Sequence, residues 1–374
     1  MKILLVFEYF SPKVGGAELV LKRLAEELAA RGHEVQVITS KLSPDTKDFE
    51  EVGGVHISRV TVPRVADRYF FAFLSIPKMI KEAKEHDLIH TMTWTGACVA
   101  WLAARLWRKP CVLTVLEVLG PRWSILNINC ITKLLFRVFE KFLLSLPFDA
   151  YVCISQATQK DLARVRGSFD KTYVAYVGVD EQFFASHSVA SEQVRKKLGI
   201  NKEEFIYLYF GRPGITKGVE YLLQAVPLIS KEIPNSRLVM LLAKEPRQRH
   251  RQICAQIDAL KLRDRVILLD SVNRQDLPSY ITSANCVVVP SLTEGFGLTA
   301  AEACALGVPV VATNVGSLPE VVSGAFVLVN PRDAQDLARG VKMIRDGEYE
   351  TTPLKRFSWD DMVERYCEIY ANLI

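Results

Sequence analysis

The chain has 374 residues, 49% of them hydrophobic and 24% charged, which is the composition of a folded globular protein and excludes a disordered one. This length is enough for two domains of ordinary size. The net charge of +5 comes entirely from residues 1–180, which hold 24 Lys and Arg against 19 Asp and Glu, while the remainder holds 23 of each. The basic half favours an anionic partner such as a membrane surface or an acidic acceptor. Nucleic acid is disfavoured, because no zinc-finger spacing or RNA-binding aromatic signature accompanies the charge.

The cellular setting follows from what the chain lacks. The apolar stretch within Met1–Glu8 is too short for a signal peptide, and no uncharged apolar stretch reaches the roughly 18 residues of a transmembrane helix. Eight cysteines lie mostly in apolar runs without a Cys-x-x-Cys pair, which indicates reduced thiols. We therefore expect a cytoplasmic protein, with peripheral association at the inner membrane face left open.

Strands and helices alternate along the first half. The helix predicted at Gly16–Arg31 has an apolar face and ends before Gly32. The strands are near-continuous apolar runs, as in parallel sheets buried on both sides. They are predicted at Lys2–Phe10, Glu34–Thr39, Leu88–Thr91, Pro110–Val115 and Ala150–Ile154.

The second half repeats this alternation. Its strands are predicted at Phe205–Phe210, Arg237–Ala243, Val266–Leu269, Cys286–Pro290, Pro309–Ala312 and Phe326–Val329. Its helices are predicted at Gly218–Ile233, Gln248–Leu260, Asp276–Ser283, Leu298–Leu306, Ala334–Ile344 and Trp359–Leu373. The pattern predicts two doubly wound, Rossmann-like α/β domains with a ligand in the cleft between them. The polar segment Ser186–Ser191 is predicted to be the linker.

The most informative segment is Glu294-Gly-Phe-Gly-Leu298, followed by Glu302. It lies between a predicted strand and a predicted helix, so backbone N–H groups and the positive end of a helix dipole face one spot, which suits a phosphate. The two carboxylates, eight residues apart, are better suited to accept hydrogen bonds from sugar hydroxyls. The segment therefore predicts a nucleotide-sugar site.

A second cluster follows the first strand of the second half. Arg212 and Lys217 flank a glycine-containing turn at a predicted helix N-terminus. Cations are unfavourable there unless an anion joins them, so the pair indicates a bound diphosphate. Gly15 and Gly16 follow the first strand of the chain, where the backbone could approach an anion closely, although a simple tight turn is an equal interpretation.

These motifs together resemble the retaining glycosyltransferases of the GT-B fold, family 4 (glycosyl transferases group 1). The resemblance rests on the Gly-Arg-x-x-x-x-Lys-Gly motif ending at Gly218 and on the loop from Glu294 to Glu302. It extends over nearly the whole chain through short segments: Gly15–Glu18, Val152–Ser155, Gly178–Asp180, Gly307–Ala312 and Phe357–Trp359.

The resemblance implies roles for residues. Arg212 and Lys217 would clamp the donor diphosphate, and the backbone of Gly295, Phe296, Gly297 and Leu298 would bind the phosphates and sugar. Glu294 would hold sugar hydroxyls and Glu302 the nucleotide ribose, while Gly15 and Gly16 would approach the diphosphate and acceptor. The reaction would move a hexose-type sugar from a UDP- or GDP-linked donor to a lipid-linked or glycan hydroxyl, with retention of configuration. No cofactor and no metal are expected, because no Asp-x-Asp motif is present.

The resemblance also implies an acceptor domain at residues 1–185, a nucleotide-sugar domain at 195–355 and a terminal helix at 357–374 that returns to the first domain. Two histidines that the family often has are missing: Met92 stands two residues after His90, and Leu116 follows Thr114-Val115 where the family pattern is Thr-Val-His. His90 and Glu117 remain candidate acceptor or sugar contacts, with a hydrogen-bonded core role open for His90. A nucleotide-sugar epimerase and a donor-binding subunit without activity are the alternative functions.

Two segments of the first half combine apolar residues with cations. Arg64–Leu74 clusters aromatic residues, and Ile131–Leu146 carries Lys133, Arg137 and Lys141 at four-residue spacing. Both fit an interfacial membrane contact, and both fit helices packed on the core of the first domain.

Overall fold

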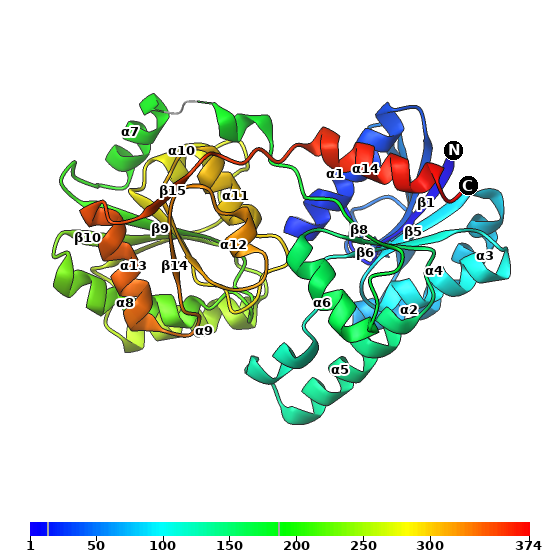
Figure 1. Ribbon diagram of the computed structural model, residues 1–374, viewed down its shortest axis with the longest axis horizontal. Coiled ribbons are helices and arrows are strands. Elements are labelled where there is room, and N and C mark those ends of the chain that lie inside the picture. The colour runs from blue at the N-terminus through cyan, green and yellow to red at the C-terminus, as the bar shows by residue number, and fades with distance from the viewer. Residues whose placement is uncertain (13–14, 186–187) are drawn as a thin grey trace. The chain divides into compact units, whose positions relative to one another are not determined.

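The computed structural model describes residues 1–12, 15–185 and 188–374. The chain forms two compact units, one of residues 1–178 together with 358–374, and one of residues 179–357 (Figure 1). We call them unit 1 and unit 2 and describe each by itself. Among the described residues no helix has both the length and the apolarity needed to cross a bilayer.

Unit 1 is built on an eight-stranded sheet with the order β3-β4-β2-β1-β5-β6-β7-β8. The strands are β1 (Lys2–Val6), β2 (Glu34–Lys41), β3 (Phe49–Val52), β4 (Val55–Thr61), β5 (Leu88–Met92), β6 (Cys111–Val115), β7 (Ala150–Cys153) and β8 (Thr172–Val174). All neighbours pair in parallel except β3, which runs antiparallel to β4. The strand order reverses between β1 and β5, and this reversal is where parallel α/β sheets place ligands.

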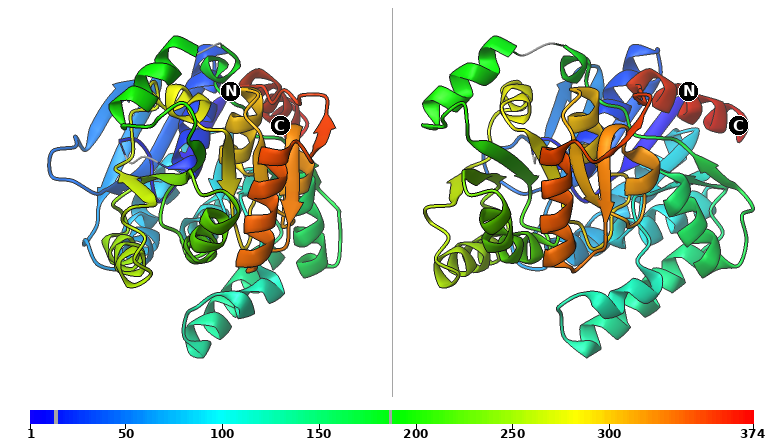
Figure 2. Two further views of the ribbon diagram at one scale, coloured as in Figure 1. Left: turned by 90° about the vertical axis from the view of Figure 1, so that its left-hand side faces the viewer. Right: turned by 60° about the vertical axis from the view of Figure 1, so that its left-hand side comes forward.

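Helices cover this sheet and carry its connections (Figure 2). They are α1 (Gly16–Ala30), α2 (Asp67–Leu74), α3 (Ile76–Glu85), α4 (Thr95–Leu106), the 3-10 helix η1 (Gly120–Ile125), α5 (Cys130–Ser145), α6 (Gln156–Arg166) and α14 (Trp359–Ala371). The α14 helix comes from the far end of the chain. It packs on α1, where Arg31 donates to Asp360 at 2.8 Å, and its Tyr366 and Tyr370 are fully buried.

Unit 2 has a seven-stranded sheet with the order β11-β10-β9-β12-β13-β14-β15. The strands are β9 (Phe205–Gly211), β10 (Ser236–Leu242), β11 (Val266–Leu269), β12 (Cys286–Val289), β13 (Val310–Thr313), β14 (Gly324–Val329) and β15 (Glu350–Thr352). The helices are η2 (Glu181–Phe184), α7 (Ser188–Lys197), α8 (Val219–Glu232), α9 (Arg247–Ala259), α10 (Leu277–Thr282), α11 (Leu298–Ala305), α12 (Leu318–Val321) and α13 (Ala334–Asp346). Only β15 pairs antiparallel, with β14. The strand order reverses between β9 and β12.

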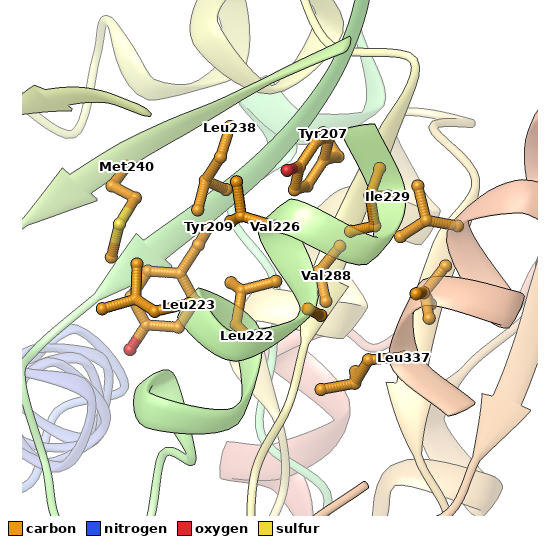
Figure 3. Close-up of a cluster of buried hydrophobic side chains, with 14 of the residues drawn as sticks. Tyr207, Tyr209, Leu222, Leu223, Val226, Ile229, Leu238, Met240, Val288 and Leu337 are labelled. Carbon is orange, nitrogen blue, oxygen red and sulfur yellow. The ribbon is translucent and has the colours of Figure 1, made fainter. Parts of the chain in front are cut away.

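The core of unit 2 lies between its sheet and α8 (Figure 3). Leu222, Val226 and Ile229 recur at helical spacing and are at most 1% exposed, and they pack with Tyr207 of β9 and Leu238 of β10. Each such side chain contributes about 1.5–3 kcal/mol by leaving water. This packing fixes the start of α8, and therefore the loop between β9 and α8.

The predicted α/β class is confirmed, with two differences in detail. The predicted linker Ser186–Ser191 is wrong for most of its length, because α7 begins at Ser188. Residues 186–187 lie outside the described residues. The antiparallel edge strands β3 and β15 are additions to the predicted parallel pattern, and each is short and largely exposed.

Candidate functional site

The candidate site of unit 2 is built where its strand order reverses. The neighbouring parallel strands β9 and β12 align Tyr207 with Cys286, and their following connections leave in opposite directions along the sheet. Two loops therefore meet at the carboxyl ends of these strands: residues 212–218, and residues 290–297. These are the two segments that carry the predicted donor motifs, and the sheet topology brings them together.

The two loops are tied to each other through the backbone. Leu292 N donates to Thr216 O at 2.7 Å. Gly218 has a φ of +62°, and a Cβ at this position would lie 1.9 Å from Pro290 O. Only glycine fits such an approach, because any side chain would overlap the carbonyl oxygen. The glycine before α8 therefore serves loop packing as well as helix initiation.

Lys217 and Glu294 form an ion pair across these loops. Lys217 Nζ lies 2.8 Å from Glu294 Oε2 and 3.1 Å from Oε1, and Ser291 Oγ donates to Oε2 at 3.0 Å. The Glu294 side chain is 11% exposed, whereas that of Lys217 is 34% exposed. Gly316 holds the loop from the other side, since its Cβ would lie 2.1 Å from Glu294 O. The carboxylate is thus fixed and the ammonium remains accessible to a ligand.

Two helix N-termini begin at the same loops. α8 starts directly after Gly218, and α11 starts directly after Gly297, which has a φ of +93°. The unpaired N–H groups and positive dipole ends of such helices favour an anion. Arg212 lies in the same loop as Lys217, and its side chain is exposed. The arrangement can hold an anionic group beside a carboxylate that accepts hydrogen bonds from hydroxyls.

Phe296 anchors this loop through its buried side chain. Its side chain is 3% exposed and meets the Phe357 ring edge-on, with centroids 5.1 Å apart. Gly295 and Gly297 on either side of it are buried, and Leu298 is half-buried. The aromatic ring thus anchors the loop, and ligand contacts in this stretch would come from the main chain.

Glu302 is held by an arginine that the sequence motifs do not include. Arg274 Nη2 donates to Glu302 Oε1 at 2.8 Å, and Arg274 Nε donates to Asp180 Oδ2 at 2.6 Å. Glu302 is 3% exposed, and burial raises its pKa to about 6, although Arg274 acts to lower it. Arg274 lies in the loop before α10, with no recognisable spacing to Glu302, so no sequence signal could have identified it.

Unit 1 has a buried carboxylate at its own reversal point. Glu8, just after β1, is 1% exposed. Its Oε1 accepts from Gly96 N at 2.7 Å and from Thr95 Oγ1 at 3.1 Å, both at the start of α4. Burial raises its pKa, against the effect of Arg68 and these hydrogen bonds. Glu8 was not predicted as a site residue, because the strand predicted at Lys2–Phe10 includes it, whereas β1 ends at Val6.

The other unit 1 candidates are placed as follows. Gly15 precedes α1 with an extended φ of 179°, so its conformation does not itself require glycine, and Gly16 is the first residue of α1. Residues 13 and 14 before them lie outside the described residues. Glu117 is half-buried after β6. Ser155 caps α6 by accepting from Thr158 N at 3.0 Å.

His90 lies in the core, in the hydrogen-bonded role that the sequence analysis left open for it. It is fully buried in β5, with Nε2 2.7 Å from Thr114 Oγ1 and Nδ1 2.6 Å from the Tyr370 hydroxyl. Thr114 Oγ1 in turn lies 2.7 Å from the Tyr366 hydroxyl. Burial lowers the pKa of His90 to about 3. Both ring nitrogens are thus engaged in the network that joins α14 to the sheet of unit 1.

Comparison with known proteins agrees with this geometry. Residues 14–183 match the family model described as Glycosyltransferase Family 4, and residues 190–355 match Glycosyl transferases group 1. An uncharacterised glycosyltransferase of Methanocaldococcus jannaschii is 28% identical over 99% of this chain and 98% of its own length. A D-inositol 3-phosphate glycosyltransferase of Xylanimonas cellulosilytica is 29% identical, over 96% of this chain and 92% of its own.

Solved structures show the same fold. Sucrose-phosphate synthase from Thermosynechococcus elongatus has a TM-score of 0.84 at 25% identity, covering 100% of this chain and 99% of that one. Anabaena HepE in complex with UDP has a TM-score of 0.77 at 23% identity, with both chains covered completely. Fold, site topology and family matches together define a glycosyltransferase of the GT-B fold. The chain belongs to glycosyltransferase family 4, as its motifs predicted.

Proposed function

We propose that this glycosyltransferase moves a hexose-type sugar from a UDP- or GDP-linked donor to a hydroxyl of a lipid-linked or glycan acceptor, with retention of anomeric configuration. The observation that carries the proposal is the Lys217–Glu294 pair, fixed between two helix N-termini where β9 and β12 diverge. Support for the donor class comes from HepE, whose structures contain UDP and UDP-glucose. The role would lie in glycan biosynthesis.

The first part of the proposal concerns the leaving group. A donor diphosphate at this site would meet Lys217 and the exposed Arg212 together with the N–H groups that begin α8 and α11. As the glycosidic bond breaks, negative charge grows on the diphosphate, and these positive groups stabilise it more in the transition state than in the ground state. Arg212 could grip two phosphate oxygens at once, and Lys217 adds a compact charge.

The second part concerns the sugar and the nucleotide. When a diphosphate engages Lys217, the Glu294 carboxylate is released to accept hydrogen bonds from sugar hydroxyls, beside the backbone of residues 295–298. Glu302, with one oxygen on Arg274, would accept from the ribose. Unit 1, proposed as the acceptor domain with Gly15, Gly16 and Glu117, would deliver the acceptor hydroxyl to the face that the diphosphate leaves, which retains configuration through an oxocarbenium-like state.

Lys217→Ala tests the diphosphate clamp, with Lys231→Ala as the matched control because Lys231 is an exposed lysine on the same α8. We expect Lys217→Ala to lower turnover by at least about tenfold, or roughly 1.4 kcal/mol of transition-state stabilisation, and Lys231→Ala to leave it unchanged. The assay presents UDP- and GDP-sugars to a panel of acceptors and determines the anomeric configuration of the product by NMR. Wild-type turnover in Lys217→Ala would remove the clamp, and an epimerised donor without transfer would replace the proposed reaction.

A further inference from the structure

The α5 helix of unit 1 carries an apolar stripe on its exposed side. Five large hydrophobic side chains on this 16-residue helix are each more than half exposed. They are Ile131, Leu134, Leu135, Val138 and Phe142. Their spacing of three, one, three and four residues puts them on one face of the helix. Soluble proteins seldom expose a continuous apolar face, so the stripe indicates an interaction surface.

The other side of α5 is packed against its own unit. Leu143 and Leu144 are at most 2% exposed and belong to the core of unit 1. The Phe136 ring lies 5.3 Å from the ring of Trp123 in η1. Figures 1 and 2 show the helix extending away from the sheet of unit 1. One face thus holds α5 to the protein, and the exposed stripe is left over from that packing.

The charges of α5 are sorted between these two faces. Glu140, its one acidic residue, points inward and accepts from Leu119 N at 2.8 Å, Gly120 N at 2.7 Å and Trp123 Nε1 at 3.1 Å. Arg137 and Lys141 are exposed. The outer surface of the helix is therefore apolar and positive, without a carboxylate of its own.

The α2 helix, which lies earlier in the chain, likewise exposes apolar side chains and turns its acidic residue inward. Its exposed side chains include Tyr69, Phe70 and Phe73. Asp67, the one acidic residue of α2, accepts from the Tyr9 hydroxyl at 2.9 Å and is thereby turned toward the unit. Arg68 is exposed beside the same hydroxyl, to which its Nε donates at 3.2 Å.

The two helices are connected through one aromatic residue. Arg68 of α2 lies over the Trp94 ring, 6.0 Å from its centroid, and Trp94 contacts Phe136 of α5 edge-on at 6.2 Å. The two exposed apolar segments are thus joined by side chains within unit 1, and they can act as one surface. We call α2 and α5 with these exposed residues the apolar-basic surface.

We propose that the apolar-basic surface docks on a lipid bilayer that contains anionic headgroups. Apolar side chains can enter the acyl boundary while Arg137 and Lys141 remain among the headgroups. A second copy of this chain fits less well, because two α5 faces would bring cations together with no outward acid to oppose them. At about 24 Å, α5 is also too short and too charged to cross the bilayer, so it would lie in its interface.

This inference deepens the proposed function, because it names the surface where the enzyme would meet a lipid-linked acceptor. It rests on the proposed function in that one respect, the lipid-linked acceptor. The tests of the two can be separated. Membrane docking is measured by sedimentation with vesicles in the absence of any sugar. Donor binding is measured by the shift in melting temperature with UDP- and GDP-sugars in the absence of vesicles, which also shows that each variant is folded.

The experiment compares vesicles of phosphatidylcholine alone with vesicles of equal parts phosphatidylcholine and phosphatidylglycerol, at low salt. The double variant Leu135→Gln/Val138→Gln removes apolar surface without adding charge, and Arg137→Gln/Lys141→Gln removes the two cations. The control is Leu228→Gln, a partly exposed leucine on α8 of unit 2. We expect the wild type and Leu228→Gln to pellet with anionic vesicles, and each α5 double variant to lose at least about tenfold in partitioning.

Four results would overturn the proposal. The wild type could stay in the supernatant with anionic vesicles, or it could pellet equally well with both compositions. The third is a dimer in sedimentation velocity that Leu135→Gln/Val138→Gln converts to a monomer, since the stripe would then bind a second copy. An α5 variant that keeps its donor-induced melting shift and its vesicle binding would likewise show that α5 is not the docking element.

Discussion

The buried carboxyl of Glu302 gives a pH dependence of stability that a single substitution can isolate. Glu302 lies 3% exposed in α11, with Arg274 Nη2 donating to it at 2.8 Å. Burial is the largest influence and raises its pKa from 4.5 to about 6, while Arg274 opposes that rise. Glu302→Gln keeps the size of the side chain and an oxygen for Arg274, but it cannot titrate.

The sign and the magnitude follow from linkage. Between about pH 4.5 and pH 6 the folded chain holds a proton on Glu302 that the unfolded chain has released. The wild type therefore loses stability relative to Glu302→Gln as the pH rises through this window, and the loss is complete above it. A difference of about 1.5 pKa units corresponds to about 2 kcal/mol. Taking the difference between the two proteins cancels the titration of the other groups.

Urea unfolding of both proteins from about pH 4 to pH 8 measures this difference. A second comparison introduces Arg274→Met into both proteins. This substitution removes the cation that lowers the folded-state pKa of Glu302, so the upper end of the window should move to higher pH in the wild-type background, and no such window should appear in the Glu302→Gln background. A difference that is flat across this range, or one in which the wild type gains stability as the pH rises, would refute the buried and titrating Glu302.

Two further substitutions test the attachment of α14 to unit 1. Tyr370→Phe leaves His90 Nδ1 without its buried partner at 2.6 Å and should lower the free energy of unfolding by about 1–3 kcal/mol. The control Tyr349→Phe, at a 40% exposed tyrosine, should change that free energy by no more than about 0.5 kcal/mol. Equal urea midpoints for the two variants would contradict the hydrogen-bond network. Gly178→Ala would place a Cβ 2.4 Å from Trp359 N, so we expect the free energy of unfolding to fall by at least about 2 kcal/mol, or the protein to fail to fold. An unchanged melting temperature would show that Gly178 and Trp359 are not in tight contact.

Much of the fold could be predicted because its strands are buried on both faces. β5, β6 and β12 are wholly buried, and such strands show in the sequence as short apolar runs between helical patterns. β3 and β15 are mostly or wholly exposed and include glutamates. Their existence depends on an edge of a neighbouring strand being available to pair, and a local pattern cannot contain that information.

The candidate site also contains parts that the sequence could predict and parts that it could not. The motifs around Lys217 and Glu294 were recognisable separately, because each follows a buried strand. Their contact at 2.8 Å depends on β9 and β12 being neighbours, which strand order decides and spacing does not. Arg274 was out of reach, since it meets Glu302 and Asp180 only after folding. For His90, the sequence indicated a hydrogen-bonded core role but could not identify its partner Tyr370, which lies 280 residues away.

The loop from Glu294 to Glu302 is also held to both segments where the chain passes between unit 1 and unit 2, near Val179 and near Phe357. Phe296 packs on Phe357, the last residue of unit 2, at 5.1 Å. Glu302 is joined through Arg274 to Asp180, next to the first residue of unit 2. These two segments are themselves paired, with Val179 N donating to Phe357 O at 2.9 Å. Arg274 therefore ties the buried Glu302 to Asp180, beside the segment where the chain enters unit 2.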